Sequence, residues 1–469
     1  MDSLTWISRT TSIGLLACVL AACNPTDSAG SYGANHQSSS PEKAASALTP
    51  GFVTDVPLLD EQMLSVDFWQ HRLADDSVRM SPADVSRLNS SSFSSDPNLH
   101  DLDAFPAHLN GAQVIELLDA VSRPASSPRY FTDGRQVTAE DYAALEQAVQ
   151  RSAVPAQVDV QWGLVVARAS MRSYPTHTRV VKSVDDQDLD RFQETGVFPG
   201  QRLAILHESA DGEWWFAVNY HYAAWLPKDS VAIGEREQIN EWFTQSPRLT
   251  VTGAQVRTNF NPEEPRSAAD VGHNVHGQNP HASYIVALPV RSEGGALEFE
   301  PTLIGRAQDV TSGTLPYRPS LVLQQAFKFL GERYGWGHDY NGRDCTGFVG
   351  EVYKSFGILM PRNSGQQGTS EFAPTKQFAP DDHAARAEAL ASLQVGDLIY
   401  IPGHVMMYIG TVDGEPFVIH DVTGLSYYQQ DESLYRGTLS GVSVTPLSTL
   451  QLGKDKSYID GIYAIKSII

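Results

Sequence analysis

After residue 23 the sequence holds a single cysteine, Cys345, so no internal disulfide can stabilise the folded chain. Apolar residues at three- and four-residue spacing run from 348 to 356, and Gly357 supplies a stop signal, so the pattern predicts a helix that begins at Cys345. Unpaired N–H groups and the positive end of the helix dipole favour an anion in the first turn of a helix. We therefore expect Cys345 to have a lowered thiol pKa and to act as a nucleophile. The alternative is a buried structural cysteine, which is the commoner role of a free thiol.

Length and charge limit the class of protein. The 469 residues are enough for about three domains. A net charge of −21 and a pI near 5.0 argue against nucleic acid as a partner, because an acidic surface repels polyanions. We attribute the acidity to a solvated surface that keeps the protein soluble.

The first 23 residues have the pattern of a bacterial lipoprotein signal. Arg9 precedes an apolar run from Ile13 to Ala22, and Leu20-Ala21-Ala22-Cys23 resembles a lipoprotein processing site. This resemblance implies that residues 1–23 are the signal, that Cys23 carries the lipid, and that the protein faces the periplasm from a membrane of the cell envelope. Residues 24–51 are rich in Ser, Ala, Gly and Asn and are expected to form a flexible tether. For residues 1–23, the alternative to a lipoprotein signal is a simple membrane anchor.

The middle of the chain predicts three further segments. Residues 52–155 show amphipathic helices, clearest at 112–121 and at 138–149, where Thr138 is the expected N-cap. Residues 156–235 change to short strand patterns at 158–166, 201–207, 214–218 and 224–227, with Asp211-Gly212 as a turn. A second segment of this kind, 236–317, has its best strand at 283–288 and a turn at 293–295. Both resemble small bacterial SH3-like barrels.

Residues 318–469 form the last expected domain. Ser320 is the predicted cap of a helix that precedes the Cys345 helix, and the polar stretch 370–392 is predicted to be an insertion or a surface loop. Strands are predicted at 396–401, 404–410 and 417–420, with Asp413-Gly414 as the turn between the last two. His404 and His420 therefore lie on one hairpin. The sequence does not fix their register, and a shift of one residue would place them on opposite faces.

A cysteine nucleophile needs a base to take its proton, and the base needs a third group to fix its tautomer. Cys345, His404 and His420 are residues of the types that these three roles require. A zinc site made by the same three residues is the sharper alternative, but no closely spaced ligand pair is present to organise it, so we predict no metal and no cofactor. A lone histidine in a strand is more often a core or surface residue.

Five motifs in order carry a family resemblance: Tyr334-Gly335-Trp336-Gly337, Asp344-Cys345-Thr346-Gly347-Phe348, Pro361-Arg362-Asn363-Ser364, Gly396-Asp397-Leu398, and His404-Val405 through Tyr408-Ile409-Gly410. Together they resemble the NlpC-type cell-wall cysteine peptidases over about 318–469. The resemblance implies an α+β, papain-like catalytic domain that follows two SH3-like barrels and a helical segment. It also implies hydrolysis of the bond between γ-D-glutamate and the diamino acid in peptidoglycan stem peptides.

The resemblance assigns roles to individual residues. It implies that Cys345 is the nucleophile, His404 the general base and acid, and His420 the group that orients His404. Tyr334 would donate to the oxyanion beside the backbone N–H of Cys345, a role that also suits a helix N-terminus. Two positions depart from the family pattern: Thr346 stands where serine is usual, and His338 where a second glycine commonly follows.

The most detailed prediction from the sequence concerns the residues that bind the substrate. We place Trp336 and Thr346 among the substrate-binding residues. In the subgroup that the chain resembles, the acidic residue before the nucleophile and an aromatic residue of the first SH3-like domain bind the free N-terminal amine of the stem peptide. These would be Asp344 and Tyr222, with Tyr220 as the next choice; a plain helix-capping role is the alternative for Asp344.

Two other functions remain open on the sequence. One is a non-catalytic lipoprotein that binds murein through its barrels, and the other is a thiol acyltransferase of related fold. The intact set of Cys345, His404 and His420 argues against the first. Analysis of the products formed from murein peptides and from lipids would distinguish all three functions.

Overall fold

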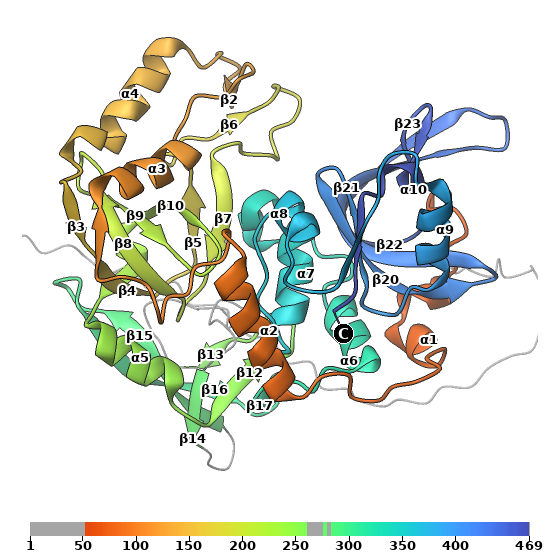
Figure 1. Cartoon of the computed structure of the whole chain (residues 1–469), viewed down its shortest axis with the longest axis horizontal. Helices are drawn as coiled ribbons and strands as arrows, with labels where there is room; N and C mark the ends of the chain where they lie inside the picture. Colours follow the sequence, from red (N-terminus) through yellow and green to blue (C-terminus); the bar gives the residue numbers. More distant parts are fainter. Residues whose placement is uncertain (1–51, 260–274, 279–282, 469) are drawn as a thin grey trace, which may run out of the picture. The chain divides into compact units, whose positions relative to one another are not determined.

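Three large antiparallel sheets organise the computed structural model, which describes residues 52–259, 275–278 and 283–468 (Figure 1). The predicted signal at 1–23, the predicted lipidation site at Cys23 and the predicted tether at 24–51 lie outside the described residues. Residues from Phe52 onward belong to one structural unit.

The N-terminal segment forms helices as predicted. These are η1 (Glu61–Leu64), α1 (Val66–Gln70), α2 (Pro82–Ser95), α3 (Gly111–Val121) and α4 (Ala139–Val149), followed by η2 (Arg151–Ala153). Thr138 caps α4 as expected, because its side chain accepts from the backbone of Asp141 and the Asp141 carboxylate accepts in return.

These helices do not share a core of their own, which differs from the separate helical domain expected over 52–155. Trp69 of α1 and Val85 of α2 are buried in the core of the C-terminal domain. Val114 of α3 and Val149 of α4 are buried in the core of the first large sheet instead. Such short helices have too little apolar surface to fold alone, so each one packs on a neighbouring sheet.

The first large sheet forms where strands were predicted. Its order is β11-β4-β8-β9-β10-β5-β7, with β4 (Gln161–Val165), β5 (Ala169–Arg172), β7 (Gln193–Val197), β8 (Arg202–Glu208), β9 (Trp214–Val218), β10 (Ala223–Pro227) and, after η3 (Lys228–Ser230), β11 (Val231–Ile233). Two small sheets border it, β1 (His108–Asn110) with β3 (Gln157–Asp159) and β2 (Tyr130–Phe131) with β6 (Val180–Val181). Gly212, in the predicted turn, has a positive φ of 77° between β8 and β9.

The second sheet follows α5 (Arg236–Thr244). Its order is β13-β16-β15-β14-β12-β17, with β12 (Arg248–Val251), β13 (Thr258–Asn259), β14 (Val275–Gln278), β15 (Ser283–Arg291), β16 (Leu297–Gly305) and β17 (Val310–Ser312). The predicted turn at 293–295 joins β15 to β16, where the N–H of Gly295 donates to the carbonyl of Ser292.

The C-terminal sheet has the order β18-β25-β19-β20-β21-β22. Its strands are β18 (Thr375–Gln377), β19 (Leu398–Ile401), β20 (His404–Val412), β21 (Glu415–Tyr428), β22 (Leu434–Pro446) and β25 (Ala464–Lys466), and β23 (Gln451–Gly453) and β24 (Lys456–Ser457) form a small pair. The helices are α6 (Pro319–Phe327), η4 (Trp336–Asn341), α7 (Cys345–Lys354), α8 (Ser364–Thr369), α9 (His383–Ala391) and α10 (Tyr458–Gly461).

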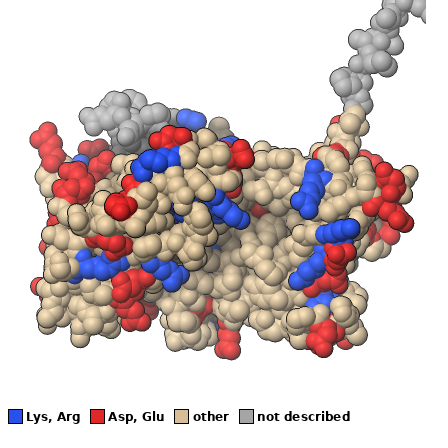
Figure 2. Space-filling model, turned by 90° about the horizontal axis from the view of Figure 1, so that it is seen from above, with Lys and Arg blue, Asp and Glu red and all other residues tan. Residues whose placement is uncertain are grey.

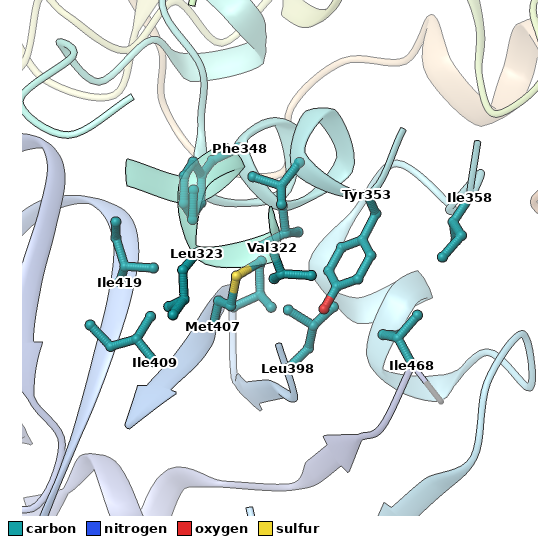
Figure 3. Close-up of a cluster of buried hydrophobic side chains, with 14 of the residues drawn as sticks. Val322, Leu323, Phe348, Tyr353, Ile358, Leu398, Met407, Ile409, Ile419 and Ile468 are labelled. Carbon is teal, nitrogen blue, oxygen red and sulfur yellow. The ribbon is translucent and has the colours of Figure 1, made fainter. Parts of the chain in front are cut away.

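Helices cover both faces of this sheet. Figure 3 shows Phe348 of α7 and Leu323 of α6 beside Met407 and Ile419, which project from one face of β20 and β21. The other face, which carries Met406, packs against α9 and α10. The face under α7 is therefore the one that reads Val405, Met407, Ile409 along β20.

Two local predictions in this domain were wrong. The N-cap of α6 is Arg318 rather than Ser320, because Pro319 occupies the first helical position and Ser320 uses both its N–H and its hydroxyl to bond the Asp76 carboxylate. The stretch 370–392 is not a loop throughout, since it contains β18 and α9.

On the face shown in Figure 2, acidic and basic side chains are interspersed. Among the described residues no helix has the length and apolar character needed to cross a membrane.

Candidate active site

Cys345 is the first residue of α7, where the sequence placed it. Asp344 is the N-cap, and its Oδ1 accepts from the N–H of Gly347 at 2.8 Å. The thiol is buried, with 7% of the residue exposed, and the N–H of Val405 donates to its sulfur. Helix α7 therefore presents the sulfur to the first residues of β20.

His404 and His420 come together as predicted. His404 Nε2 lies 2.8 Å from His420 Nδ1. The register that the sequence left open is set by the pair Met407 and Ile419. His404 is three residues before Met407 and His420 is one residue after Ile419, so both project from the face opposite to those two residues.

A third group completes this line of hydrogen bonds. Thr445 Oγ1 lies 3.0 Å from His420 Nε2, and both atoms are buried. Thr445 is on β22, opposite Val418. No sequence motif pointed to it, because the contact depends on the pairing of β21 with β22.

Cys345 and the histidine pair lie at the same end of β20, and no hydrogen bond joins the sulfur to the His404 ring among the described residues. His404 is the first residue of the strand, directly after a turn in which Gly403 has a positive φ of 78°. The bond from Val405 to the sulfur places Cys345 beside the backbone of His404. Because His420 engages Nε2 of His404, Nδ1 is the ring nitrogen of His404 left for another partner, and it is also the one nearer to its own backbone.

The protonation states differ from those expected at sequence level. Burial, and then the negative charge of Asp344, raises the pKa of Cys345 to about 12, against the lowered pKa that the helix N-terminus predicted. Burial lowers the pKa of His404 to about 4. The resting site therefore holds a neutral thiol and a neutral imidazole. The sequence correctly predicted that Cys345 begins a helix, but it did not predict the burial that raises the thiol pKa, because burial depends on tertiary packing.

Asp344 is fully occupied by protein groups. Besides Gly347, its oxygens accept from Thr346 Oγ1 at 3.0 Å, from the N–H of Gly337 at 3.0 Å, and from Arg362 Nη1 and Nη2 at 3.1 and 2.7 Å. The Arg362 guanidinium and other nearby groups hold the pKa of this buried carboxyl well below its usual range. The structure thus gives Asp344 the helix-capping role. Thr346 belongs to the same cluster, since Arg362 also donates to its hydroxyl.

Tyr334 lies near the nucleophile. Its N–H donates to the carbonyl of Ser440 at 2.8 Å, which fixes the segment against β22. Burial, and then the charges of Asp344 and Cys345, raises the pKa of its hydroxyl, which therefore stays a hydrogen-bond donor.

The two barrel tyrosines have different surroundings. The hydroxyl of Tyr222 donates to Glu194 Oε2 at 2.5 Å and also bonds Asn363, next to Arg362. The ring of Tyr220 instead lies 6.0 Å from Lys354 Nζ, at the far end of α7. Tyr222 is therefore the one of these two tyrosines with a hydrogen bond to the motif that contains Arg362, through Asn363. Glu194 was missed at sequence level because a single glutamate in a strand gives no signal.

Trp336 and His338 connect the first sheet to the catalytic domain. Trp336 Nε1 donates to the carbonyl of Gln193 at 3.1 Å, so this side chain joins the first sheet to the catalytic domain. His338 is buried with a positive φ of 66°, and its Nδ1 lies 3.3 Å from Arg362 Nη2. A cavity of about 260 Å³ nearby is lined by Arg168, Ala169, Ser170, His338, Asp339, Tyr340 and Asn341.

The motifs and this geometry agree with a known family. Residues 331–444 match the model of the NlpC/P60 family. The chain carries an NlpC/P60 domain. Residues 177–227 match the model of the SH3 domain of SH3b1 type, a range that contains β6 and the strands β7 to β10 of the first large sheet.

Relatives of the NlpC/P60 domain are known. The chain is 27% identical over 241 residues to a γ-D-glutamyl-L-lysine dipeptidyl-peptidase of Bacillus cereus, an alignment that covers 46% of this chain and 65% of that protein. It is 26% identical over 135 residues to dipeptidyl-peptidase 6 of Lysinibacillus sphaericus, covering 28% and 43%. The chain thus spans less than two thirds of the length of these curated relatives.

A solved structure shares the fold. An NlpC/P60 endopeptidase from Photobacterium damselae subsp. piscicida superposes with a TM-score of 0.68 at 16% identity, covering 85% of this chain and 96% of that one. The mixed helix and sheet fold predicted for the chain, with an SH3-like domain before a papain-like NlpC/P60 domain, is confirmed. The SH3-like nature of residues 236–317 stays a prediction.

Proposed function

We propose that this protein is a cysteine peptidase that hydrolyses peptidoglycan stem peptides between γ-D-glutamate and the diamino acid. The observation that carries the proposal is the placement of Cys345 at the start of α7, beside the strand end where His404 bonds His420. The name of the Bacillus cereus relative, a γ-D-glutamyl-L-lysine dipeptidyl-peptidase, supports the choice of bond.

The hydrogen bonds define which tautomer of His404 can act as base. For Nδ1 to accept a proton, the neutral ring must carry its own proton on Nε2 and donate it to His420 Nδ1. His420 then carries its proton on Nε2 and donates to Thr445 Oγ1. All three groups are satisfied by this one arrangement.

Proton transfer starts the reaction. His404 Nδ1 takes the proton of the Cys345 thiol as substrate binds, and the thiolate attacks the carbonyl carbon of the amide. The neutral resting thiol makes this base necessary. Cys345 at the start of α7 and His404 at the start of β20 lie at the same end of that strand. Catalytic hydrogen bonds commonly tighten only when substrate is bound.

The oxyanion that forms has two donors available. One is the backbone N–H of Cys345, which is unpaired by the helix because it belongs to the first turn of α7. The other is the hydroxyl of Tyr334. Imidazolium His404 then returns its proton to the leaving amine as the carbon–nitrogen bond breaks, which leaves a thioester. Water, deprotonated by His404, hydrolyses the thioester and restores the thiol.

We also propose that the substrate is a peptide with a free N-terminal L-Ala, as the sequence predicts, but with a different acidic partner. Asp344 has no capacity left for an ammonium group, since both oxygens already accept from Arg362 and from backbone. Glu194 accepts from Tyr222 beside the same motif, and burial raises its pKa. A partly desolvated carboxylate gains most from an incoming cation, so we assign the amine to Glu194 and Tyr222.

The lipid anchor on Cys23 and the location in the cell envelope are part of this proposal. They are supported by the signal pattern in residues 1–23. An envelope location would bring the domain to peptidoglycan.

The proposal is tested by incubating the protein with L-Ala-γ-D-Glu-diamino-acid peptides and with phospholipids, and by identifying products by mass spectrometry. We expect a new amino group on the diamino acid, its loss in Cys345→Ala, and no effect of EDTA. Acyl transfer to or from lipid would support the acyltransferase. Binding without turnover would support a murein-binding protein, and loss with EDTA and rescue by zinc would support a metal site.

A further inference from the structure

Asp421 is a buried acid on the side of the sheet that packs against the catalytic helix. It lies two residues after Ile419 on β21, so both side chains project from the same face, which Figure 3 shows at Ile419 next to Phe348. Two residues before Met407 on β20 comes Val405, whose N–H bonds the Cys345 sulfur. By the register of Met407 with Ile419, Asp421 is the residue that faces Val405 across the two strands.

The segment before η4, which includes Gly331 and Glu332, contacts the strand next to Asp421. Val442, the strand partner of Asp421, exchanges backbone bonds with this segment: its N–H donates to Glu332, and the N–H of Gly331 donates to its carbonyl. Tyr334 follows two residues later. Asp421 thus lies between the strand position that holds the sulfur and the segment that carries the proposed oxyanion donor.

Neither oxygen of Asp421 has a hydrogen-bond partner among the described residues, and its exposed fraction is 0%. A buried carboxylate without a donor is very unfavourable, so the group gains by keeping its proton. The charged groups that act on it are Asp344 from α7 and Glu332 and Arg343 from the neighbouring segment. Arg343 is already paired with Glu332 and lowers the pKa of Asp421 by less than burial, Asp344 and Glu332 raise it.

Burial and the negative charges of Asp344 and Glu332 raise the pKa of Asp421 to about 9. In the opposite direction, a charge on Asp421 raises the pKa of Cys345 and of Tyr334. A negative Asp421 would therefore oppose both the thiolate and the oxyanion, whereas an uncharged Asp421 opposes neither.

We propose that Asp421 is a positioning residue of the cysteine site: it stays an uncharged carboxylic acid while the peptidase works, and its ionisation turns the site off by placing a negative charge beside the sulfur of Cys345. The inference rests on the proposed function for its effect on hydrolysis, but not for its effect on the thiol. No proton leaves Asp421 during turnover. It acts through Cys345 and Tyr334 and makes no contact with the reacting atoms.

The test compares Asp421→Asn, which has nearly the same shape and cannot ionise, with the wild-type protein between pH 6 and 10.5. Two rates are measured: peptide hydrolysis, and alkylation of Cys345 by iodoacetamide, followed by mass mapping of the labelled peptide. Wild-type hydrolysis should fall above about pH 9, and about tenfold per pH unit thereafter. The variant should keep its rate, and its alkylation should rise more steeply with pH than in the wild type.

Asp397→Asn is the matched control, because Asp397 is also a buried carboxyl of this domain but belongs to the turn before β19, where it accepts from Gln394. It should keep the wild-type pH profile. Circular dichroism at each pH restricts the comparison to folded protein, and Asp421→Ala replaces Asp421→Asn if the amide does not fold.

Identical pH profiles of hydrolysis and alkylation in the wild type and in the uncharged variant would overturn the proposal. So would a folded Asp421→Asn protein that is inactive at pH 7. If the wild type hydrolyses no peptide, the proposed function fails, while alkylation still decides whether Asp421 controls the thiol.

Discussion

His404 Nε2 lies 2.8 Å from His420 Nδ1, and His420 reaches Thr445 through its other ring nitrogen. This line makes His404 the proton carrier and His420 its support. We expect His404→Ala to lower kcat/KM by about 10²- to 10⁴-fold, because the base itself is lost, and His420→Ala to lower it less. The double variant should be little worse than His404→Ala alone. Steady-state hydrolysis of a free stem peptide gives the comparison, and additive losses would mean that His420 works independently of His404.

Thr445 is expected to fix the tautomer of the pair. Its hydroxyl accepts from His420 Nε2 only while His404 keeps its proton on Nε2, which is the form that can act as base through Nδ1. Thr445→Val removes the acceptor at similar volume and should lower kcat with little change in KM. Thr445→Ser keeps the hydroxyl and should restore most of the rate. Equal rates for the Val and Ser variants would show that the Thr445 hydroxyl does not fix the tautomer of the histidine pair.

The acid limb of the pH profile should report His404. Burial lowers the pKa of its imidazole to about 4, so the ring is neutral above that pH and becomes protonated below it. A protonated ring cannot accept the thiol proton. We therefore expect kcat/KM to be flat between about pH 5 and pH 8 and to fall about tenfold per unit below pH 4. A midpoint near the ordinary histidine value would mean that water reaches the ring in the working enzyme.

Much of this site could be predicted because its signals are local. Cys345 begins a helix with an acidic cap, and Asp413-Gly414 forms the turn that puts His404 and His420 on one hairpin. The Cys345 pKa could not be predicted, because the helix end lowers it while burial and Asp344 raise it, and burial depends on residues far away in the chain. The same holds for Asp344, whose partner Arg362 is set by tertiary packing, and for Ser320, which bonds Asp76 across 244 positions.

The ion pair of Arg362 with Asp344 should stabilise the domain far more than a surface pair. Both side chains are buried, and Arg362 Nε also donates to Thr195 Oγ1 of the first sheet at 2.7 Å. Arg362→Met leaves a buried carboxylate without its cation and should lower the free energy of unfolding by about 3–5 kcal/mol.

Chemical denaturation of the wild type and the variant measures this change. Arg87→Met breaks a pair with Asp84 in which the arginine side chain is 73% exposed, and it should have a much smaller effect. Similar losses of unfolding free energy in both variants would show that the buried pair stabilises the protein no more than the exposed pair does.

Recognition of the free amine should depend on Glu194 and not on Asp344. Glu194 accepts from Tyr222 and carries a raised pKa, whereas every lone-pair direction that Asp344 offers is used by Arg362, Thr346 and backbone N–H groups. Glu194→Gln keeps the hydrogen bond from Tyr222 and removes the charge. We expect it to raise KM for free L-Ala-γ-D-Glu-diamino-acid peptides about tenfold or more, which is the loss of one charge-assisted hydrogen bond.

The decisive measurement is the ratio of kcat/KM for the free peptide to that for the same peptide N-acetylated or joined to muramic acid. In the wild type this ratio should be large, and in Glu194→Gln it should fall toward one, because only the free peptide loses an interaction. Tyr222→Phe tests the hydroxyl separately, and Tyr220→Phe is its control, since that ring packs against Lys354 at the far end of α7. An unchanged ratio in a folded Glu194→Gln protein, or a wild type that cleaves free and sugar-linked peptides equally well, would contradict this assignment of the amine site.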